Sequence, residues 1–191
     1  MKRIETNLSG VCVIEPDVFG DDRGFFMESY NKRAFEQIGI NHEFVQDNMS
    51  RSTRGVVRGL HYQLGQPQAK LVRVTLGEVY DIAVDVRRGS ETFGQWACAE
   101  LSDENKKMFF VPEGFAHGFC VISDIAEFAY KCSDFYAPDE ERGIIWNDPD
   151  LAIPWPLGDA APILSPKDAA YGPLAEMDPR DLPVFGEGSD Q

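Results

Sequence analysis

Apolar and charged side chains alternate along part of this chain, and this alternation restricts its fold more than any other feature. In the clearest stretch, Tyr80, Ile82 and Val84 alternate with residues that include Asp81 and Asp85. Successive side chains of a strand point to opposite faces, so the pattern predicts a half-buried strand. Similar short apolar runs recur through most of the chain, separated by turn-forming residues. A fold built from sheets is therefore expected.

The remaining predicted strands are rich in β-branched and aromatic residues and lie at 11–15, 25–30, 56–63, 71–76, 96–101, 108–111, 118–122, 126–132 and 143–146. Turns are predicted between them, including one at 19–22. One early stretch has helical features, because Asn31 can cap residues 32–38 and Gly39 would end them. Many short strands with almost no helix predict an all-β sandwich or barrel. We favour a double-sheet jelly roll over an up-and-down barrel.

The chain length of 191 residues fits one domain, which we place at residues 1–185. Proline becomes frequent after Asp148, which predicts a loop-rich C-terminal tail with a few short helices. Residues 186–191 are expected to be flexible.

The net charge of −14 limits the partners of the protein. An acidic surface repels nucleic acid and anionic membranes, so neither is an expected partner. A small anion can still bind where basic side chains gather at one place.

The four cysteines, Cys12, Cys98, Cys120 and Cys132, form no CxxC pair, which argues against a zinc ribbon or a redox motif. We interpret them as buried, reduced thiols. The first residues lack the apolar segment of a secretory signal, and no apolar run approaches the length of a membrane span. A cytoplasmic location is expected.

The chain has three histidines, and two of them lie in motifs. His42 lies among polar residues and is interpreted as a solvated loop side chain. His117 ends a Pro-Glu-Gly-Phe-Ala-His stretch over 112–117 that resembles the second signature of the cupin superfamily. The first signature of metal-binding cupins has two histidines, whereas residues 61–63 read His-Tyr-Gln. A metal site of that kind is incomplete, so no metal is expected.

Longer stretches extend the resemblance; they lie at 18–29, 44–48, 55–63, 70–73, 111–119, 130–131, 135–136, 141, 146–149 and 164–168. Together they resemble the dTDP-4-dehydrorhamnose 3,5-epimerase family, over residues 4–168. The resemblance implies a cupin-type jelly-roll barrel. It also implies cofactor-free conversion of dTDP-4-dehydro-6-deoxy-D-glucose to dTDP-4-dehydro-L-rhamnose, a step in dTDP-L-rhamnose synthesis.

The chemistry of that reaction explains which residue types it needs. The hydrogens on C3 and C5 of a 4-keto sugar are both alpha to the ketone. Removing one gives an enolate, and returning a proton to the other face inverts the carbon. The reaction needs a base on one face, an acid on the other and a cation at the enolate oxygen.

The resemblance assigns these roles to four residues. His61 is the base, and an imidazole suits proton transfer near neutral pH. Asp168 would orient His61 and support the imidazolium. Tyr130 is the acid on the other face, and Lys70 lies close to the ketone oxygen. Without the resemblance, Asp168 would be interpreted as a surface acid, Tyr130 as a core tyrosine and Lys70 as a solvated lysine.

The positions that match substrate contacts of the family are Arg23, Glu28, Gln46, Asp47, Asn48, Arg58, Lys70, His117, Tyr136, Glu141 and Lys167. Arg23, Arg58 and Lys167 would supply positive charge for a diphosphate. Glu28 would contact the nucleotide, and Tyr136 would stack on the thymine ring.

The family exchanges its N-terminal strands between two subunits, which implies a homodimer in which Arg23 and Glu28 serve the site of the neighbour. Phe25 and Phe26 are interpreted as core residues. Three alternatives stay open: an epimerase that inverts only C3 or C5, a metal-dependent cupin such as a dioxygenase, and a non-catalytic sugar-nucleotide binding protein.

Overall fold

The computed structural model describes residues 1–186, so nearly all of the tail expected at 186–191 lies outside the described residues. Two antiparallel sheets form the body. The six-stranded sheet has the order β1 (Lys2–Glu5), β2 (Cys12–Glu15), β10 (Met108–Val111), β7 (Lys70–Leu76), β12 (Ile125–Cys132) and β5 (Gln46–Thr53). The five-stranded sheet has the order β13 (Glu141–Gly143), β6 (Val57–Gln63), β11 (Phe115–Val121), β8 (Glu78–Asp85) and β9 (Trp96–Ser102). The prediction of an all-β, double-sheet fold is confirmed.

The main apolar core lies between these sheets. Val72 and Phe109 contribute from the six-stranded sheet, and Val79 from the five-stranded sheet; all three are at most 1% exposed. The rings of Phe119 on β11 and Phe128 on β12 stack across the gap at 4.1 Å. Face-to-face packing of this kind removes the core-lining part of both sheets from water.

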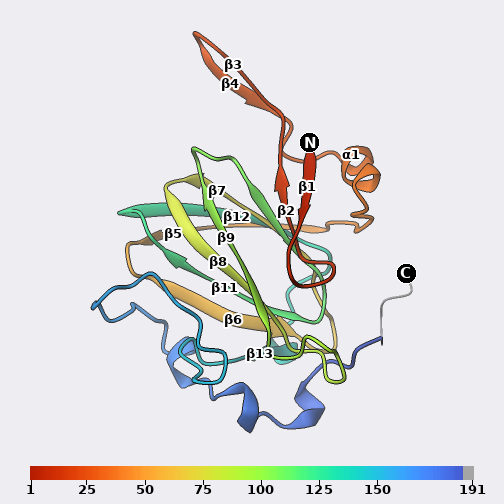
Figure 1. The fold of residues 1–191 in the computed structure, drawn as a ribbon, viewed down its shortest axis with the longest axis vertical. Coiled ribbons are helices and arrows are strands. Elements are labelled where there is room, and N and C mark those ends of the chain that lie inside the picture. The colour runs from red at the N-terminus through yellow and green to blue at the C-terminus, as the bar shows by residue number, and fades with distance from the viewer. Residues whose placement is uncertain (187–191) are drawn as a thin grey trace.

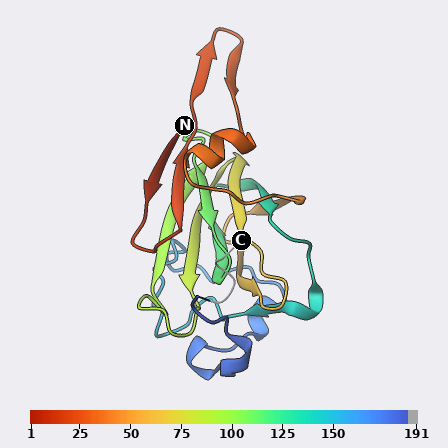
Figure 2. The same cartoon turned by 90° about the vertical axis from the view of Figure 1, so that its right-hand side faces the viewer.

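A hairpin of β3 (Val18–Asp21) and β4 (Gly24–Met27) extends from one end of the molecule (Figures 1 and 2). The predicted turn at 19–22 is wrong, because residues 18–21 form β3 and the turn lies at Asp22 and Arg23. The core interpretation of Phe25 and Phe26 is also wrong, since they are 58% and 70% exposed. The hairpin stands away from both sheets, and Phe19, Phe25 and Phe26 on it remain largely exposed in this chain.

Helix α1 (Lys32–Gln37) matches the prediction. The Asn31 side chain accepts a hydrogen bond from the Arg33 amide at 3.1 Å, as an N-cap should, and Gly39 follows the helix. Phe35 packs with Ile14 of β2 and Phe110 of β10 in a second core, outside the six-stranded sheet.

Several strand predictions need correction. Strands β1 and β5 are not among the predicted strands. The sequence of β5 is almost wholly polar, so it lacks the apolar run by which the other strands are predicted. The strand expected at 143–146 ends instead at Gly143. Cys98 is exposed rather than buried, because alternation along β9 turns it outward.

Strand β8 is not half-buried, because Asp81 and Asp85 are fully buried. One face of β8 meets the space between the sheets, where Ala83 lies in the main core. Ile82 and Val84 on the other face are covered by residues of the C-terminal segment such as Leu174. Both faces of β8 are therefore buried, although its alternating sequence predicts that only one face is buried.

The C-terminal segment runs along the end of the molecule opposite the hairpin (Figure 1). It contains the short 3₁₀ helices η2 (Asp168–Ala170), η3 (Leu174–Glu176) and η4 (Pro179–Asp181), and η1 (Pro138–Glu140) precedes β13. The expectation of a loop-rich tail with few short helices is confirmed. Within residues 1–186, no helix is long and apolar enough to cross a bilayer.

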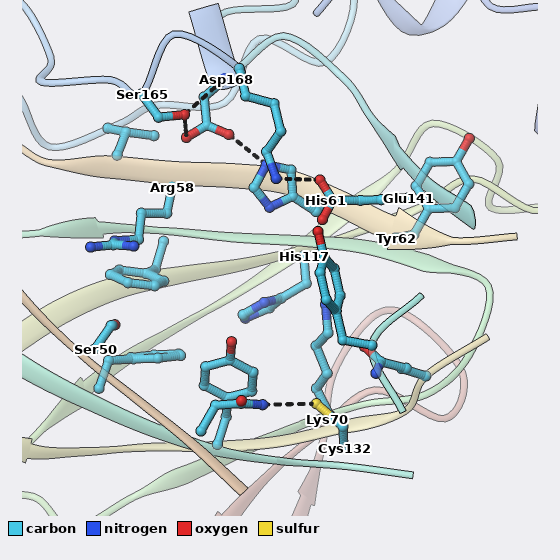
Figure 3. A pocket seen from close by; sticks show the side chains of 18 of the residues that line it. Ser50, Arg58, His61, Tyr62, Lys70, His117, Cys132, Glu141, Ser165 and Asp168 are labelled. Carbon is cyan, nitrogen blue, oxygen red and sulfur yellow. Dashed lines mark hydrogen bonds and ion pairs between the residues drawn. The ribbon is translucent and has the colours of Figure 1, made fainter. Parts of the chain in front are cut away.

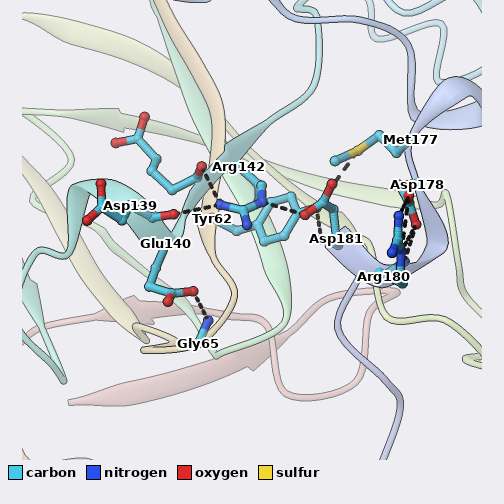
Figure 4. A network of polar contacts seen from close by, with 10 residues as sticks. Tyr62, Gly65, Asp139, Glu140, Arg142, Met177, Asp178, Arg180 and Asp181 are labelled. Carbon is cyan, nitrogen blue, oxygen red and sulfur yellow. Dashed lines mark hydrogen bonds and ion pairs between the residues drawn. The ribbon is translucent and has the colours of Figure 1, made fainter.

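Polar contacts tie this segment to β6 and β13 (Figure 4). Arg142 Nε donates to Asp181 Oδ1 at 2.7 Å, and the Tyr62 hydroxyl donates to the Asp181 carbonyl at 2.7 Å. Tyr62 is 3% exposed, so this second bond satisfies a buried hydroxyl. The strand that carries Glu141 is thereby fixed from its outer side.

Candidate active site

A cavity of about 900 Å³ opens between the two sheets and is lined by residues of both. Its size is in the range of small-molecule sites. Alternation along β5 and β12 turns Gln46, Asn48, Tyr130 and Cys132 into it. The polar sequence of β5 is explained by this position, because its inner face lines a cavity rather than a core.

His61 on β6 is held by a carboxylate from the C-terminal segment. Its Nε2 lies 2.5 Å from Asp168 Oδ1, and the Ser165 hydroxyl donates to Asp168 Oδ2 at 2.8 Å. Burial would raise the pKa of Asp168, but the hydrogen bonds from His61 and Ser165 outweigh it and lower the pKa. An ionised Asp168 fixes the tautomer with hydrogen on Nε2, which leaves Nδ1 free. Figure 3 shows Asp168 on one side of the His61 ring and Lys70 and His117 on the other.

A bulge in β6 lets His61 and Arg58 line the same cavity although they are three residues apart. His61 pairs with His117 and Arg58 with Phe119, so β6 has one more residue than β11 in this interval. Gly59 sits in the bulge with φ of +119°, and a Cβ there would lie 2.5 Å from the Cα of Gly118. Only glycine allows this backbone conformation and this close approach.

His117 on β11 forms a second pair with Asp81 of β8. The His117 Nε2 and Asp81 Oδ1 atoms are 2.7 Å apart, and both side chains are buried. Burial raises the pKa of Asp81, and the neighbouring His117 only partly opposes it. Within the described residues Asp81 Oδ2 has no hydrogen-bond partner. Sequence reasoning missed Asp81, because its alternation with apolar residues pointed to the solvent face.

The six-stranded sheet supplies the opposite wall. Lys70 and Cys132 are register partners on β7 and β12, and Tyr130 precedes them on the same face of β12. Asn48 Nδ2 donates to Cys132 Sγ at 3.6 Å. Burial lowers the pKa of Lys70 and raises that of Tyr130. His61 and Tyr130 therefore project into one cavity from two different sheets.

Charged and aromatic groups surround the cavity entrance. Glu141 accepts hydrogen bonds from Lys167 Nζ and, at 3.0 Å, from the Tyr171 hydroxyl. Burial would raise the pKa of Glu141, but the bond from Lys167 and other neighbours lower it on balance. Arg58 Nε donates to Ser52 Oγ at 3.1 Å. Tyr136 is 51% exposed, so its ring is accessible to a ligand.

Comparison with known proteins identifies the family. A family model described as dTDP-4-dehydrorhamnose 3,5-epimerase matches residues 5–176. The chain belongs to the dTDP-4-dehydrorhamnose 3,5-epimerase family. Its activity is accordingly that of a carbohydrate epimerase in dTDP-L-rhamnose biosynthesis.

Relatives in this family are similar over nearly their whole length. The Pseudomonas aeruginosa dTDP-4-dehydrorhamnose 3,5-epimerase is 60% identical over 93% of this chain and 98% of its own. A Legionella pneumophila 3,5-epimerase, solved in complex with dTDP-4-keto-L-rhamnose, has a TM-score of 0.93 and 54% identity, and the match covers 96% of this chain and 98% of that one. A 3'-monoepimerase from Streptomyces bikiniensis, in complex with dTDP-quinovose, has a TM-score of 0.87 and 34% identity, covering 94% and 92% of the two chains. These matches confirm the cupin-like fold expected from the resemblance.

Three residues that match the family's substrate contacts lie away from the cavity of this chain. Arg23 is at the hairpin tip, where its Nε donates to Asp21 Oδ1 at 3.2 Å. Glu28 accepts a hydrogen bond from Asn31 at 2.9 Å. Asp47 pairs with Lys131 on the outer face of β5 and β12, because alternation turns it away from Gln46 and Asn48.

His42 is not simply a solvated loop side chain. Its Nε2 lies 3.0 Å from Glu113 Oε2, and Ser133 donates to Glu113 Oε1 at 2.8 Å. The Glu113 partner is 71 positions away in sequence, which no local pattern reveals. Among residues 1–186 no group of three or more His, Cys, Asp or Glu side chains is arranged to hold a metal ion.

Proposed function

We propose that this cavity is the epimerase active site and that His61, Tyr130 and Lys70 carry the reaction. The observation that supports this most strongly is the origin of His61 and Tyr130 on opposing sheets. A sugar ring lying between the sheets would have the imidazole on one face and the phenol on the other. Inversion of a carbon by proton transfer requires that placement.

The proton path follows from the hydrogen bonds. His61 Nδ1 takes the proton from C3 while the C–H electron pair moves into the enolate, and Lys70 stabilises the negative oxygen at C4. Tyr130 then donates its phenolic proton to the opposite face of C3. Solvent reprotonates Tyr130 and His61 loses its proton, after which the same cycle inverts C5. No electron leaves the substrate, so the steps balance as proton transfers alone.

Asp168 supports His61 in this scheme. The imidazolium formed at His61 lies 2.5 Å from a carboxylate whose pKa its partners lower. The ion pair lowers the energy of the charged state and keeps the ring in one orientation.

The cations at the entrance fit the nucleotide part of the substrate. Arg58 and Lys167 can bind a diphosphate, which the acidic surface of this protein would otherwise repel. Tyr136 offers an accessible ring for the thymine base. The dTDP sugar bound in the Legionella pneumophila relative supports the same class of ligand here.

We also propose that the hairpin serves a second subunit. Phe19, Phe25 and Phe26 are 66%, 58% and 70% exposed on it, which is unusual unless another chain covers them. Exchange of these arms would carry Arg23 and Glu28 into the cavity of the neighbour. Sedimentation velocity tests this: the wild type should be a dimer and Phe26→Glu largely a monomer with weakened substrate binding. A monomeric wild type would refute it.

Two broader expectations belong to the same proposal. Residues 1–185 would fold as one cupin-like domain, so a chain ending at residue 185 should unfold in one transition. The protein would lie in the cytoplasm, which fits the free thiols of Cys12, Cys120 and Cys132, and cell fractionation tests it.

Deuterium incorporation tests the function itself. The enzyme is incubated with dTDP-4-dehydro-6-deoxy-D-glucose in D2O, with and without EDTA, and the product is examined by NMR. Inversion with deuterium at both C3 and C5, unaffected by EDTA, is expected. The similarity to a 3'-monoepimerase makes inversion at one carbon the competing result. Loss of activity in EDTA would instead indicate a metal-dependent enzyme.

A further inference from the structure

The segment that supplies Asp168 also places an aromatic ring against His61. Helix η2 begins at Asp168 and ends at Ala170, and Tyr171 follows it directly as the C-cap. The rings of Tyr171 and His61 have centroids 5.7 Å apart and planes inclined at 63°. Asp168 holds one ring nitrogen of His61, but a single hydrogen bond leaves the imidazole free to tilt. A packed neighbour on the ring itself restricts that motion.

Gly143 leaves room for this contact. It is the register partner of His61 on β13, the position from which a side chain normally packs against its cross-strand neighbour. A Cβ on Gly143 would lie 2.4 Å from Tyr171 Cε2. The tyrosine ring therefore occupies the space of the missing side chain and becomes the neighbour of His61.

The hydroxyl of Tyr171 makes a different contact. It donates to Glu141 Oε1 at 3.0 Å, and Glu141 belongs to the cavity lining. Burial and the nearby Glu141 carboxylate raise the pKa of Tyr171, so the phenol keeps its proton near neutral pH. One side chain thus contacts the base through its ring and a substrate-binding position through its hydroxyl.

We propose that Tyr171 is a positioning residue, whose ring holds the His61 imidazole in place and whose hydroxyl holds the Glu141 carboxylate. This inference rests on the proposed function, in which His61 is the base and Glu141 contacts the substrate. The ring should act on proton transfer and the hydroxyl on substrate binding. The two effects are separable, because phenylalanine retains the ring and lacks the hydroxyl.

Steady-state kinetics of two variants test the division. Tyr171→Ala should lower kcat by about tenfold or more, since small misplacements of a reacting group are costly. Tyr171→Phe should keep kcat within about twofold of wild type and raise KM by about threefold or more. A kcat restored by phenylalanine would show that the ring, and not the hydroxyl, supports proton transfer. A kcat as low in Tyr171→Phe as in Tyr171→Ala would overturn the role of the ring.

Gly143 provides an independent variant. Gly143→Ala should displace the Tyr171 ring and lower kcat, because the added methyl group occupies the same space. The double variant should have the kcat of Tyr171→Ala alone, since no ring remains to be displaced. A further multiplicative loss in the double variant would contradict the proposal.

Tyr80→Ala is the matched control for general loss of an aromatic ring. Tyr80 is also partly buried and packs edge-on against Trp155 at 6.5 Å, away from the cavity lining. The Tyr80→Ala substitution should lower the midpoint of unfolding without changing kcat. If Tyr171→Ala does the same, Tyr171 only packs and the inference fails. If His61→Ala stays active, the proposed function fails instead, whatever the Tyr171 variants do.

Discussion

His61 and His117 are register partners on neighbouring strands, and each Nε2 is bound to a carboxylate from another part of the chain. The two carboxylates differ in their environment. Asp168 has a second donor in Ser165, whereas Asp81 has an oxygen without a hydrogen-bond partner in the described residues. The pKa of Asp168 is accordingly lowered and that of Asp81 raised. The first pair suits a base that becomes cationic, and the second suits a fixed substrate contact.

Asp168→Asn should greatly reduce turnover while the protein stays folded. The amide cannot stabilise the imidazolium and favours the wrong tautomer of His61, so kcat should fall by about 10²–10⁴-fold. Initial rates at saturating substrate measure this. Ser165→Ala removes the two hydrogen bonds between the Ser165 hydroxyl and Asp168 but keeps the carboxylate charge beside His61, so it should cost much less. Equal losses in the two variants would contradict the role given to the carboxylate charge.

Asp81→Asn should separate activity from stability. Because the pKa of Asp81 is raised, ionising this carboxyl costs more in the folded state than in the unfolded state. The free energy of unfolding therefore falls as pH rises above the unfolded pKa of about 3.9, and this loss is absent below it. Asparagine removes this charge and still accepts a hydrogen bond from His117. We expect lower kcat/KM with an unfolding free energy at pH 7 no smaller than that of wild type. Urea unfolding checks this, and a loss of several kcal/mol would show that the charged pair stabilises the fold.

Ionisation of Asp85 has the opposite effect on the stability of the folded state. Burial would raise its pKa, but hydrogen bonds from Arg87, Ser90 and Thr92 lower it overall. Its ionised form therefore stabilises the folded state above the unfolded pKa of about 3.9, and this contribution disappears as pH falls through the lower folded pKa. Asp85→Asn should lose about 3 kcal/mol at pH 7, and the gap to wild type should narrow in strong acid.

Asp178 offers a matched control for that experiment. Asp178 binds the backbone amide and the guanidinium of Arg180, two residues later. Asp85 and Arg87 have the same spacing, but the Asp178 pair is exposed. Solvent screens an exposed pair, so Asp178→Asn should leave the urea midpoint almost unchanged. A similar loss in both variants would show that burial is not what makes the Asp85 network important.

Gly59→Ala should destabilise the protein and disorder the cavity. The added Cβ would meet the backbone at Gly118, and φ of +119° is unfavourable for alanine. We expect a loss of about 2–4 kcal/mol in urea unfolding. Gly172→Ala is the control, because a Cβ there meets nothing within 4 Å. Equal stability of the two variants would contradict the packing account of the bulge.

Local patterns in the sequence are enough to predict the elements whose ends carry their own signals. Helix α1 is predictable because Asn31 and Gly39 bound it, and most strands because apolar runs end at turn residues. Strands β3 and β5 were not predictable in this way. The inner face of β5 lines a polar cavity, and the apolar residues of β3 and β4 are not buried in this chain.

The site was predictable only through the family's long motifs. They bring together His61, Lys70, Tyr130 and Asp168, which the structure places around one cavity. Asp81 and Tyr171 were not predicted, because their importance depends on partners far away in sequence. Asp81 pairs with His117, and Tyr171 packs against His61. Periodicity describes which face of a strand a residue occupies, but not what covers that face.

In the proposed mechanism, His61 removes the proton and Tyr130 returns one to the other face. These two roles are tested by measuring solvent-deuterium exchange and inversion on the same samples of His61→Gln and Tyr130→Phe. We expect no exchange with His61→Gln. With Tyr130→Phe we expect deuterium at C3 or C5 without inversion, because His61 can only return a proton to the face it came from. Exchange retained without His61, or abolished together with inversion in Tyr130→Phe, would contradict this assignment.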